Sequence, residues 1–394
     1  MPAFDPRQVL PLVFSQLAVN AAMAGQRMAA PLQALDAGHA AWSVGVLLAL
    51  FTALPVLTAM AAGRLADRRG YHHPLRLAVA LTVCGAALAL AACWLPGGWQ
   101  FGLLCLAAAA SGTGANICGI ATQRTGGQFA VDTTSRLRIF SWLGMAPAFA
   151  SAVGPVLAGV MIDVGGYSWA YAAMMGLPLL SLWFARGVAQ QGASVDQASA
   201  GPRGTVAELL AVPGLRRLLF VNWLLSASWD IHSFAVPVLG HARDFNASTI
   251  GVVLATFTLA VTLVRFIVPL LAHRVDEIKL LCSAMLVTGS IFLVYPFATT
   301  PLLMSVCAAL LGLTLGAVQP TVVTALYHLS PAGRHGETIA FRSMAISVSN
   351  SVMPLAFGAA GTVLGPGVMF WIMGTLVASN SWVPRGLRAG LGRP

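Results

Sequence analysis

The chain has 394 residues, of which 58% are hydrophobic and only 9% are charged, and its formal net charge is +10. Soluble globular proteins carry roughly 25% charged residues, so this composition excludes a water-soluble fold. Apolar runs of membrane-spanning length recur throughout, and they do not show the short alternating segments that are typical of a β-barrel. We therefore predict an all-α polytopic membrane protein.

Twelve apolar runs are long enough to cross a hydrocarbon core about 30 Å thick. In chain order, the predicted spans are 10–32, 42–62, 76–95, 101–122, 139–160, 168–185, 216–238, 248–271, 278–297, 301–325, 339–362 and 366–383. One long polar stretch rich in Gly, Ser and Ala, at 189–205, is typical of a flexible linker. We predict an N-terminal six-helix bundle over 1–188, a cytoplasmic linker over 189–215 and a C-terminal six-helix bundle over 216–394.

The basic residues indicate topology. With these spans, 19 of the 22 Lys and Arg residues lie on one side of the membrane or at its helix ends. The positive-inside rule then predicts that both termini and the linker are cytoplasmic. The net positive charge is therefore explained by topology and does not indicate a nucleic-acid-binding surface. The N-terminus lacks the features of a cleaved signal peptide. Usage rich in Ala, Arg and Leu favours a bacterial origin, hence the cytoplasmic (inner) membrane.

The two predicted halves repeat one another. A gap-free shift of 206 residues places Phe51 on Phe257 and Arg68 on Arg274, and a shift of 204 places Arg138 on Arg342. Duplicated halves of this kind build transporters whose site lies near the bilayer midplane, at the interface of the repeats.

The loop between the second and third spans, GRLADRRGYHHPL at 63–75, carries a recognisable motif. It resembles the signature loop of the major facilitator superfamily, G-x-L-x-D-R-x-G-R/K, and the resemblance extends over the whole chain through the twelve spans and the half-repeat. Tyr71 and His72 stand where the family usually has a basic pair. The resemblance implies a cytoplasmic latch between the two halves, whose candidate residues are Gly63, Asp67, Arg68, Gly70 and Arg138. Alternatively, the arginines of this loop are only topological determinants.

Within the loop, glycines at 63 and 70 permit close approach of the two helices. Asp67 is expected to cap a helix N-terminus or to pair with an arginine such as Arg124 or Arg138. The stretch ASAVGPVLAG (150–159) resembles the family's antiporter motif at Gly154, Pro155 and Gly159, which predicts a bent, tightly packed helix and favours export. In contrast, Ala108 stands where proton-coupled drug exporters of the family have a membrane-embedded arginine.

Polar residues at helical spacing mark one face of several spans. Intramembrane polar groups usually face a protein interior or a water-filled path, and in this family spans 1, 4, 7 and 10 line the central cavity. The predicted cavity residues are Gln16, Asn20, Arg27, Asn222, Ser226, Asp230, Gln319 and Asn350. For the Ser and Thr residues, interhelical hydrogen bonding is the favoured alternative.

Four charged or titratable residues in these spans carry hypotheses of their own. The repeat places Arg27 about 4.5 Å further out than Asp230, so we predict that the two pair and close the external side of the cavity, although Arg27 can also snorkel to headgroups. His232 is either a group that titrates with the gate or a packing histidine. Arg265 is either an anion-binding residue or a snorkelling or latch residue.

The sequence has no ATP-binding loop, zinc helix or nucleophile elbow, so we expect no enzyme activity, cofactor or metal. The leading hypothesis is a monomeric secondary active transporter that works by alternating access and exports a small amphiphilic compound by proton antiport (efflux). The alternative is an importer or exchanger of a carboxylate-type organic anion.

Overall fold

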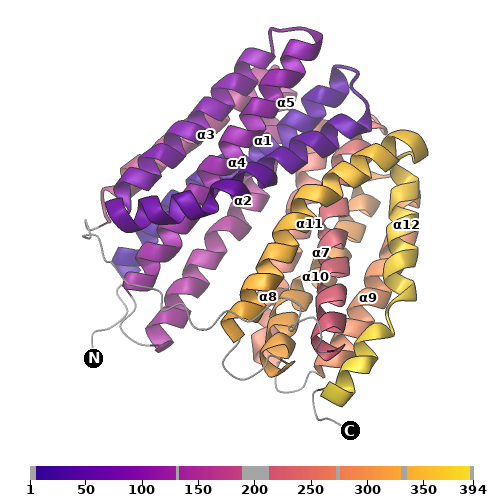
Figure 1. Ribbon diagram of the computed structural model, residues 1–394. Coiled ribbons are helices and arrows are strands. Elements are labelled where there is room, and N and C mark those ends of the chain that lie inside the picture. Colours follow the sequence, from indigo (N-terminus) through magenta and orange to yellow (C-terminus); the bar gives the residue numbers. More distant parts are fainter. Residues whose placement is uncertain (1–5, 130–132, 189–212, 272–275, 330–334, 391–394) are drawn as a thin grey trace. The chain divides into compact units, whose positions relative to one another are not determined.

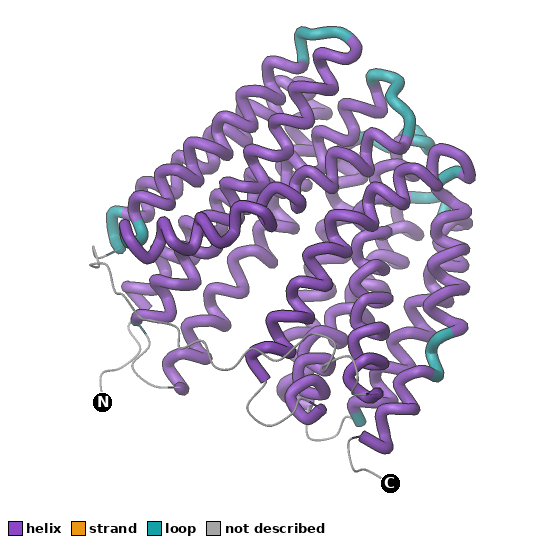
Figure 2. Tube along the Cα trace, viewed as in Figure 1, coloured by secondary structure: helices purple, strands orange, loops and turns teal. Residues whose placement is uncertain are grey.

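The computed structural model describes residues 6–129, 133–188, 213–271, 276–329 and 335–390. Over these ranges the chain forms helices and short loops, without strands (Figure 2). Its contacts divide it into two compact units. Unit 1 comprises Met1–Gln197 with Gly240–Ala255, and unit 2 comprises Ala198–Leu239 with Thr256–Pro394. The predicted linker at 189–215 lies outside the described residues up to position 212.

Unit 1 is built mainly from five helices (Figure 1). They are α1 (Pro6–Asp36), α2 (Ala41–Arg69), α3 (His72–Ala92), α4 (Gly97–Gln128) and α5 (Thr133–Ala185). The most extensive packing in this unit is of α1 on α5, and α4 packs on both α2 and α3. The end of α7 and the beginning of α8 are grouped with this unit.

The remaining helices follow in unit 2. They are α7 (Pro213–His241), α8 (Ala247–Leu271), α9 (Glu277–Val294), α10 (Pro301–Leu329), α11 (His335–Leu364) and α12 (Pro366–Ser379), with 3₁₀ helices η2 (Tyr295–Phe297) and η3 (Val383–Gly390). Helix α9 packs on α12 and α10. Its first turn is capped by Asp276, whose Oδ1 accepts hydrogen bonds from the backbone N–H groups of Ile278 and Lys279.

Helix α5 contains two of the predicted spans without the expected loop between them. Gly166 alone interrupts it, with φ 77° and ψ −175°, a conformation that L side chains rarely adopt. Most helices also extend beyond the predicted spans, because the backbone hydrogen-bond ladder continues where hydropathy falls. With α5 counted as two stretches, the eleven described α-helices account for the twelve predicted spans.

The two units share one helix crossing in detail. In unit 1, a Cβ added to Gly112 of α4 would lie 2.2 Å from the carbonyl oxygen of Phe51 on α2. In unit 2, a Cβ added to Gly312 of α10 would lie 2.3 Å from the carbonyl oxygen of Phe257 on α8. Phe51 and Phe257 are partners in the half-repeat, so the same glycine-on-carbonyl contact recurs in both units.

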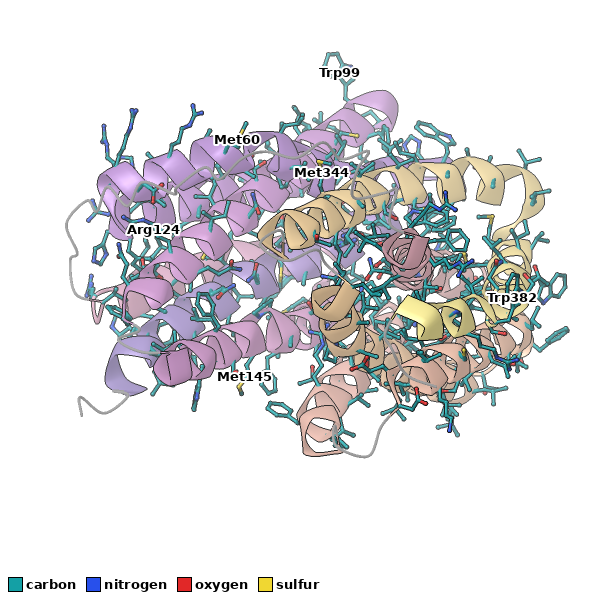
Figure 3. The ribbon with its side chains drawn as sticks, turned by 60° about the horizontal axis from the view of Figure 1, so that its bottom comes forward. Met60, Trp99, Arg124, Met145, Met344 and Trp382 are labelled. Carbon is teal, nitrogen blue, oxygen red and sulfur yellow. The ribbon has the colours of Figure 1, made fainter. Side chains whose placement is uncertain are left out.

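The outer surface is apolar. Met60 and Trp99 are 75% and 80% exposed and point away from the ribbon (Figure 3). Nine helical segments of the described chain are long and apolar enough to cross a membrane. The fold is therefore that of a multi-pass membrane protein, as the composition predicts.

Candidate functional site

The signature loop is a tight turn between α2 and α3. Gly70 ends α2 with φ 68°, and its N–H donates to the carbonyl of Ala66. Asp67 pairs with Arg124, one of its two expected partners: Arg124 Nε donates to Asp67 Oδ1 at 2.7 Å. Arg124 lies near the C-terminal end of α4 (Figure 3), so this ion pair joins α2 to α4. The other expected partner, Arg138, has its side chain outside the described residues.

Two features of this loop differ from the expectation. A Cβ on Gly63 would meet nothing within 4 Å, so the predicted close approach at Gly63 is wrong and the requirement for glycine rests on Gly70. Tyr71, at a position that is usually basic, is 2% exposed and packs with Val9 and Leu75. Burial raises the pKa of Tyr71, which therefore stays neutral and anchors the turn to the bundle. Arg68 is exposed.

The motif in α5 packs as tightly as predicted. A Cβ on Gly154 would lie 2.4 Å from the carbonyl oxygen of Ala21 on α1. Further along α5, a Cβ on Gly159 would lie 2.5 Å from the carbonyl oxygen of Ala247, at the beginning of α8. Asp163 caps the same helix end, since its two carboxylate oxygens accept from the N–H groups of Ala247 and Ser248 at 3.0 Å each.

Helix α1 has two polar faces, of which the sequence analysis found one. Gln16 and Asn20, on the predicted face, are buried, whereas Arg27 is half-buried. Gln26 and Gln33, seven residues apart, form a second face. Ser111 donates to Gln26 Oε1 at 2.6 Å, and the Tyr171 hydroxyl donates to Gln33 Oε1 at 2.7 Å. The i, i+7 spacing of two glutamines was the available signal for this packing face.

The Ser and Thr hydroxyls mostly donate hydrogen bonds to backbone carbonyls of their own helix. Thr113 donates to the carbonyl of Ala109 and Ser351 to that of Ser347, within their own helices, whereas Ser111 makes the expected interhelical bond. Ala108, at the position of the family's embedded arginine, is fully buried in an apolar cluster.

In unit 2, the predicted stripe on α7 is buried throughout: Asn222, Ser226 and Asp230 are 2%, 7% and 3% exposed. The sequence analysis did not predict the side chain that contacts the first residue of this stripe. Arg342 of α11, which the topology analysis placed only at a helix end, is 8% exposed. Its Nε donates to Asn222 Oδ1 at 3.2 Å, and its Nη2 donates to Gln319 Oε1 of α10. The repeat, which pairs Arg342 with Arg138, did not predict that Arg342 is buried.

The second partner of the stripe is Asn350, also on α11. With its amide nitrogen turned toward Asp230, Asn350 donates to both carboxylate oxygens, at 3.3 and 3.1 Å. Between the two contacts lies Ser226, whose buried hydroxyl has no hydrogen-bond partner among the described residues. The structure therefore brings together Arg342 and the five predicted cavity residues of unit 2, which are Asn222, Ser226, Asp230, Gln319 and Asn350.

His232 and Arg265 lie apart from this cluster. His232 is fully buried, stacks on Phe257 with ring centroids 4.2 Å apart, and lies with its Nε2 3.4 Å from the Tyr295 hydroxyl. This aromatic environment favours the packing interpretation. Arg265 is exposed on α8, which favours snorkelling over a buried anion site. In the described part of the chain, His, Cys, Asp and Glu do not gather into a group that could hold a metal ion.

Comparison with known proteins gives one consistent result. The family model described as Major Facilitator Superfamily matches residues 12–216 and 218–387. No curated protein matches the sequence. Among solved structures, the chain is similar to a POT family transporter in complex with 5-aminolevulinic acid, with a TM-score of 0.77 and 12% identity over 98% of this chain and 97% of that one.

Two further structures have the same fold. A peptide transporter POT in complex with sulfate matches with a TM-score of 0.75 and 13% identity, over 98% of this chain and 95% of that one. A point mutant of the nucleoside transporter NupG matches with a TM-score of 0.71 and 12% identity, over 96% of this chain and 99% of that one. The protein is thus a membrane transporter rather than an enzyme, and the chain belongs to the Major Facilitator Superfamily.

Proposed function

We propose that this secondary transporter carries a small organic solute with an anionic group. The observation that supports the proposal is the buried guanidinium of Arg342, whose acceptors are the neutral amides of Asn222 and Gln319. A cation inside a membrane protein is costly unless an anion compensates it. A planar guanidinium also matches a carboxylate in a bidentate geometry. This favours the organic-anion alternative over a purely hydrophobic substrate.

We further propose that Asp230 is the group that responds to the coupling ion, a proton. A carboxylate buried on α7 changes its interactions when it is protonated or when a substrate binds. In the proposed cycle, Asp230 pairs with Arg27 to close the external side of the cavity, and loss of that pair opens it.

The charge exchange Arg27→Asp with Asp230→Arg tests this gate. Each single variant should lose transport by about 10- to 100-fold, and the double variant should regain part of it, because the exchange restores the ion pair. Initial rates in proteoliposomes measure the effect. A double variant that is no faster than either single variant would remove the pairing from the mechanism.

The substrate proposal is tested with the purified transporter in proteoliposomes under an imposed pH gradient. A panel of carboxylates and a panel of cationic dyes are offered in both orientations of the gradient. The proposal predicts movement of carboxylates that depends on Arg342. Movement of dyes alone, unchanged in Arg342→Gln, would overturn it.

Proton-coupled export of a small amphiphilic compound is the second candidate. It is favoured by the tight packing of the α5 motif at Gly154 and Gly159, because that motif is associated with exporters. The direction of the pH gradient that drives accumulation in the experiment above distinguishes export from import.

The remaining proposals concern topology. We place both termini on the cytoplasmic side of a bacterial inner membrane, because of the distribution of basic residues, and we expect a monomer. The Asp67–Arg124 pair is then part of the cytoplasmic latch. Cysteine labelling from either side of the membrane, at the exposed Arg68 position, tests the orientation.

A further inference from the structure

The segment that follows α12 returns to the beginning of α9 within unit 2. Helix η3 packs on α9, and its Leu387 is fully buried. Arg217 of α7 donates from Nη1 to the carbonyl oxygen of Gly386 at 2.9 Å. Burial of an apolar side chain and a hydrogen bond therefore fix η3 against the helices of this unit.

A groove lies between the beginning of α9 and the segment that carries η3. Its volume is about 480 Å³, within the range of about 300–1,000 Å³ that is typical of small-molecule sites. Lys279 and Ser283 line it from α9, and Ser381 and Arg385 line it from the other side. We call it the α9–η3 groove. Lys279 and Arg385 are both exposed, so the groove is open to the surroundings.

The charge of the α9–η3 groove is positive. Two of its described lining residues are basic and none is acidic. In the described part of the chain, neither Lys279 nor Arg385 forms an ion pair with a carboxylate. The carboxylate of Asp276, three residues before Lys279, accepts from backbone N–H groups of α9, and Glu277 does not line the groove. The groove therefore attracts anions.

The wall of the groove continues into an exposed apolar stripe along α9. Leu286 lines the groove and is 53% exposed, and Val294 is 54% exposed. They follow Lys279 by 7 and 15 residues, which places all three on one helix face. The segment Glu277–Phe297 is long and apolar enough to cross a membrane, so this face meets lipid. Trp382 (Figure 3), which is 63% exposed, is a residue type that is enriched at membrane–water interfaces.

We propose that the α9–η3 groove binds the headgroup phosphate of an anionic phospholipid, whose acyl chains lie along the apolar stripe of α9. A guanidinium matches a phosphate in bidentate geometry, and a lysine adds a point charge. Basic pockets between membrane helices bind anionic headgroups for this reason. A soluble phosphate would use only the polar wall, whereas a phospholipid also uses the stripe that contains Leu286. This inference goes beyond the transported solute and does not depend on it.

The test compares two phospholipids with identical acyl chains. Phosphatidylglycerol and phosphatidylcholine both contain a phosphate, but only phosphatidylglycerol has a net negative charge. Native mass spectrometry of the full-length protein in detergent measures the affinity for each lipid. We expect phosphatidylglycerol to bind at least about 5-fold more tightly, because one basic residue near an anionic lipid contributes about this factor.

Variants assign this preference to the groove. Lys279→Gln and Arg385→Gln should each lower the affinity for phosphatidylglycerol by about 5-fold, and Lys279→Arg should retain it. Arg216→Gln, which neutralises an exposed arginine of α7 outside the groove, is the matched control and should have no effect. Ser381→Asp adds a negative charge to the groove and should also lower the affinity, so the groove can be tested even if a glutamine variant fails to fold.

Three results would overturn the inference. Equal affinity for the two lipids would show that the groove does not select an anionic headgroup. An equal loss in Arg216→Gln and Lys279→Gln would show that the attraction is spread over the basic helix ends. Displacement of phosphatidylglycerol by an equal concentration of glycerol 3-phosphate would show that the groove binds a soluble phosphate and not a lipid.

Discussion

Units 1 and 2 both bury polar side chains between helices, but the chemistry of the contacts differs. In unit 1 they are neutral: Gln26 with Ser111, and Gln33 with Tyr171. In unit 2 the two contacts between α7 and α11 each join an amide to a charged side chain, Arg342 or Asp230, whereas Thr288 with Thr314 is again a neutral pair. A neutral pair completes its hydrogen bonds by packing alone, whereas a buried charge held by amides still lacks a counter-charge in that contact. We propose that the neutral contacts hold the bundle together and that the two charged contacts belong to a binding site.

The largest expected effect tests unit 2. In Arg342→Met, we expect the initial transport rate to fall by about 10- to 100-fold. The unfolding temperature should stay level or rise, because burial of a charge without a counter-ion is costly and an apolar side chain removes that cost. Proteoliposome uptake and thermal unfolding in detergent measure the two quantities.

Arg216→Met, at an exposed site of α7, is the control for the loss of positive charge. If Arg342→Met unfolds the protein at lower temperature and transport falls only in proportion, Arg342 has a structural role like that of the glutamines of unit 1.

The crossing that both units share should respond equally in each. Gly112→Val and Gly312→Val each push a side chain into a backbone carbonyl, so we expect each to destabilise the protein by about 1–3 kcal/mol. Thermal unfolding measures the effect. Gly102→Val, on an open face of α4, is the control without a clash. A large effect in one unit alone would show that the two crossings are not equivalent.

A smaller effect is expected at the neutral contacts of unit 1. A double-mutant cycle of Gln26→Leu and Ser111→Ala should give a coupling energy of about 0.6 kcal/mol, the mean for polar contacts between membrane helices. Transport per folded molecule should not change. A loss of transport without a loss of stability would place Gln26 in the site, contrary to the comparison above.

The smallest effect is expected at the exposed ion pair of unit 1. Asp67 is 63% exposed, so Asp67→Asn should lower the free energy of unfolding by less than about 1 kcal/mol. Salt should weaken the wild-type pair and so reduce the difference. Unfolding at low and high ionic strength measures it, with Arg64→Gln as the control at an exposed arginine nearby. A difference that is insensitive to salt would mean that the carboxylate acts through another contact.

Much of the fold was predictable, because the positions of membrane spans depend on the hydropathy of residues that are contiguous in the chain. Apolar length predicted the spans, and the signature loop predicted the Asp67–Arg124 pair. Helical periodicity predicted that Asn222, Ser226 and Asp230 share one face of α7, and all three are buried. Each of these depends on residues close together in the chain or on a motif that already encodes a contact.

What the sequence missed depends on neighbours that are distant in the chain. Arg342 and Arg68 are both arginines near predicted helix ends, yet one is buried against two amides and the other is exposed. Periodicity within α11 cannot predict this difference, because burial of a helix end depends on which other helices cover it. The same reason applies to Gly63, where the motif predicts a close approach but no atom lies near.

The sequence by itself determined the class of protein, the positions of its helices and the polar face of α7, because hydropathy and helical spacing are properties of the chain alone. Only the tertiary structure shows which polar residues contact neutral groups of a neighbouring helix and which contact a buried charged side chain. That distinction requires two helices to be placed side by side, as α7 and α11 are, because only then does Arg342 reach Asn222 and Asn350 reach Asp230.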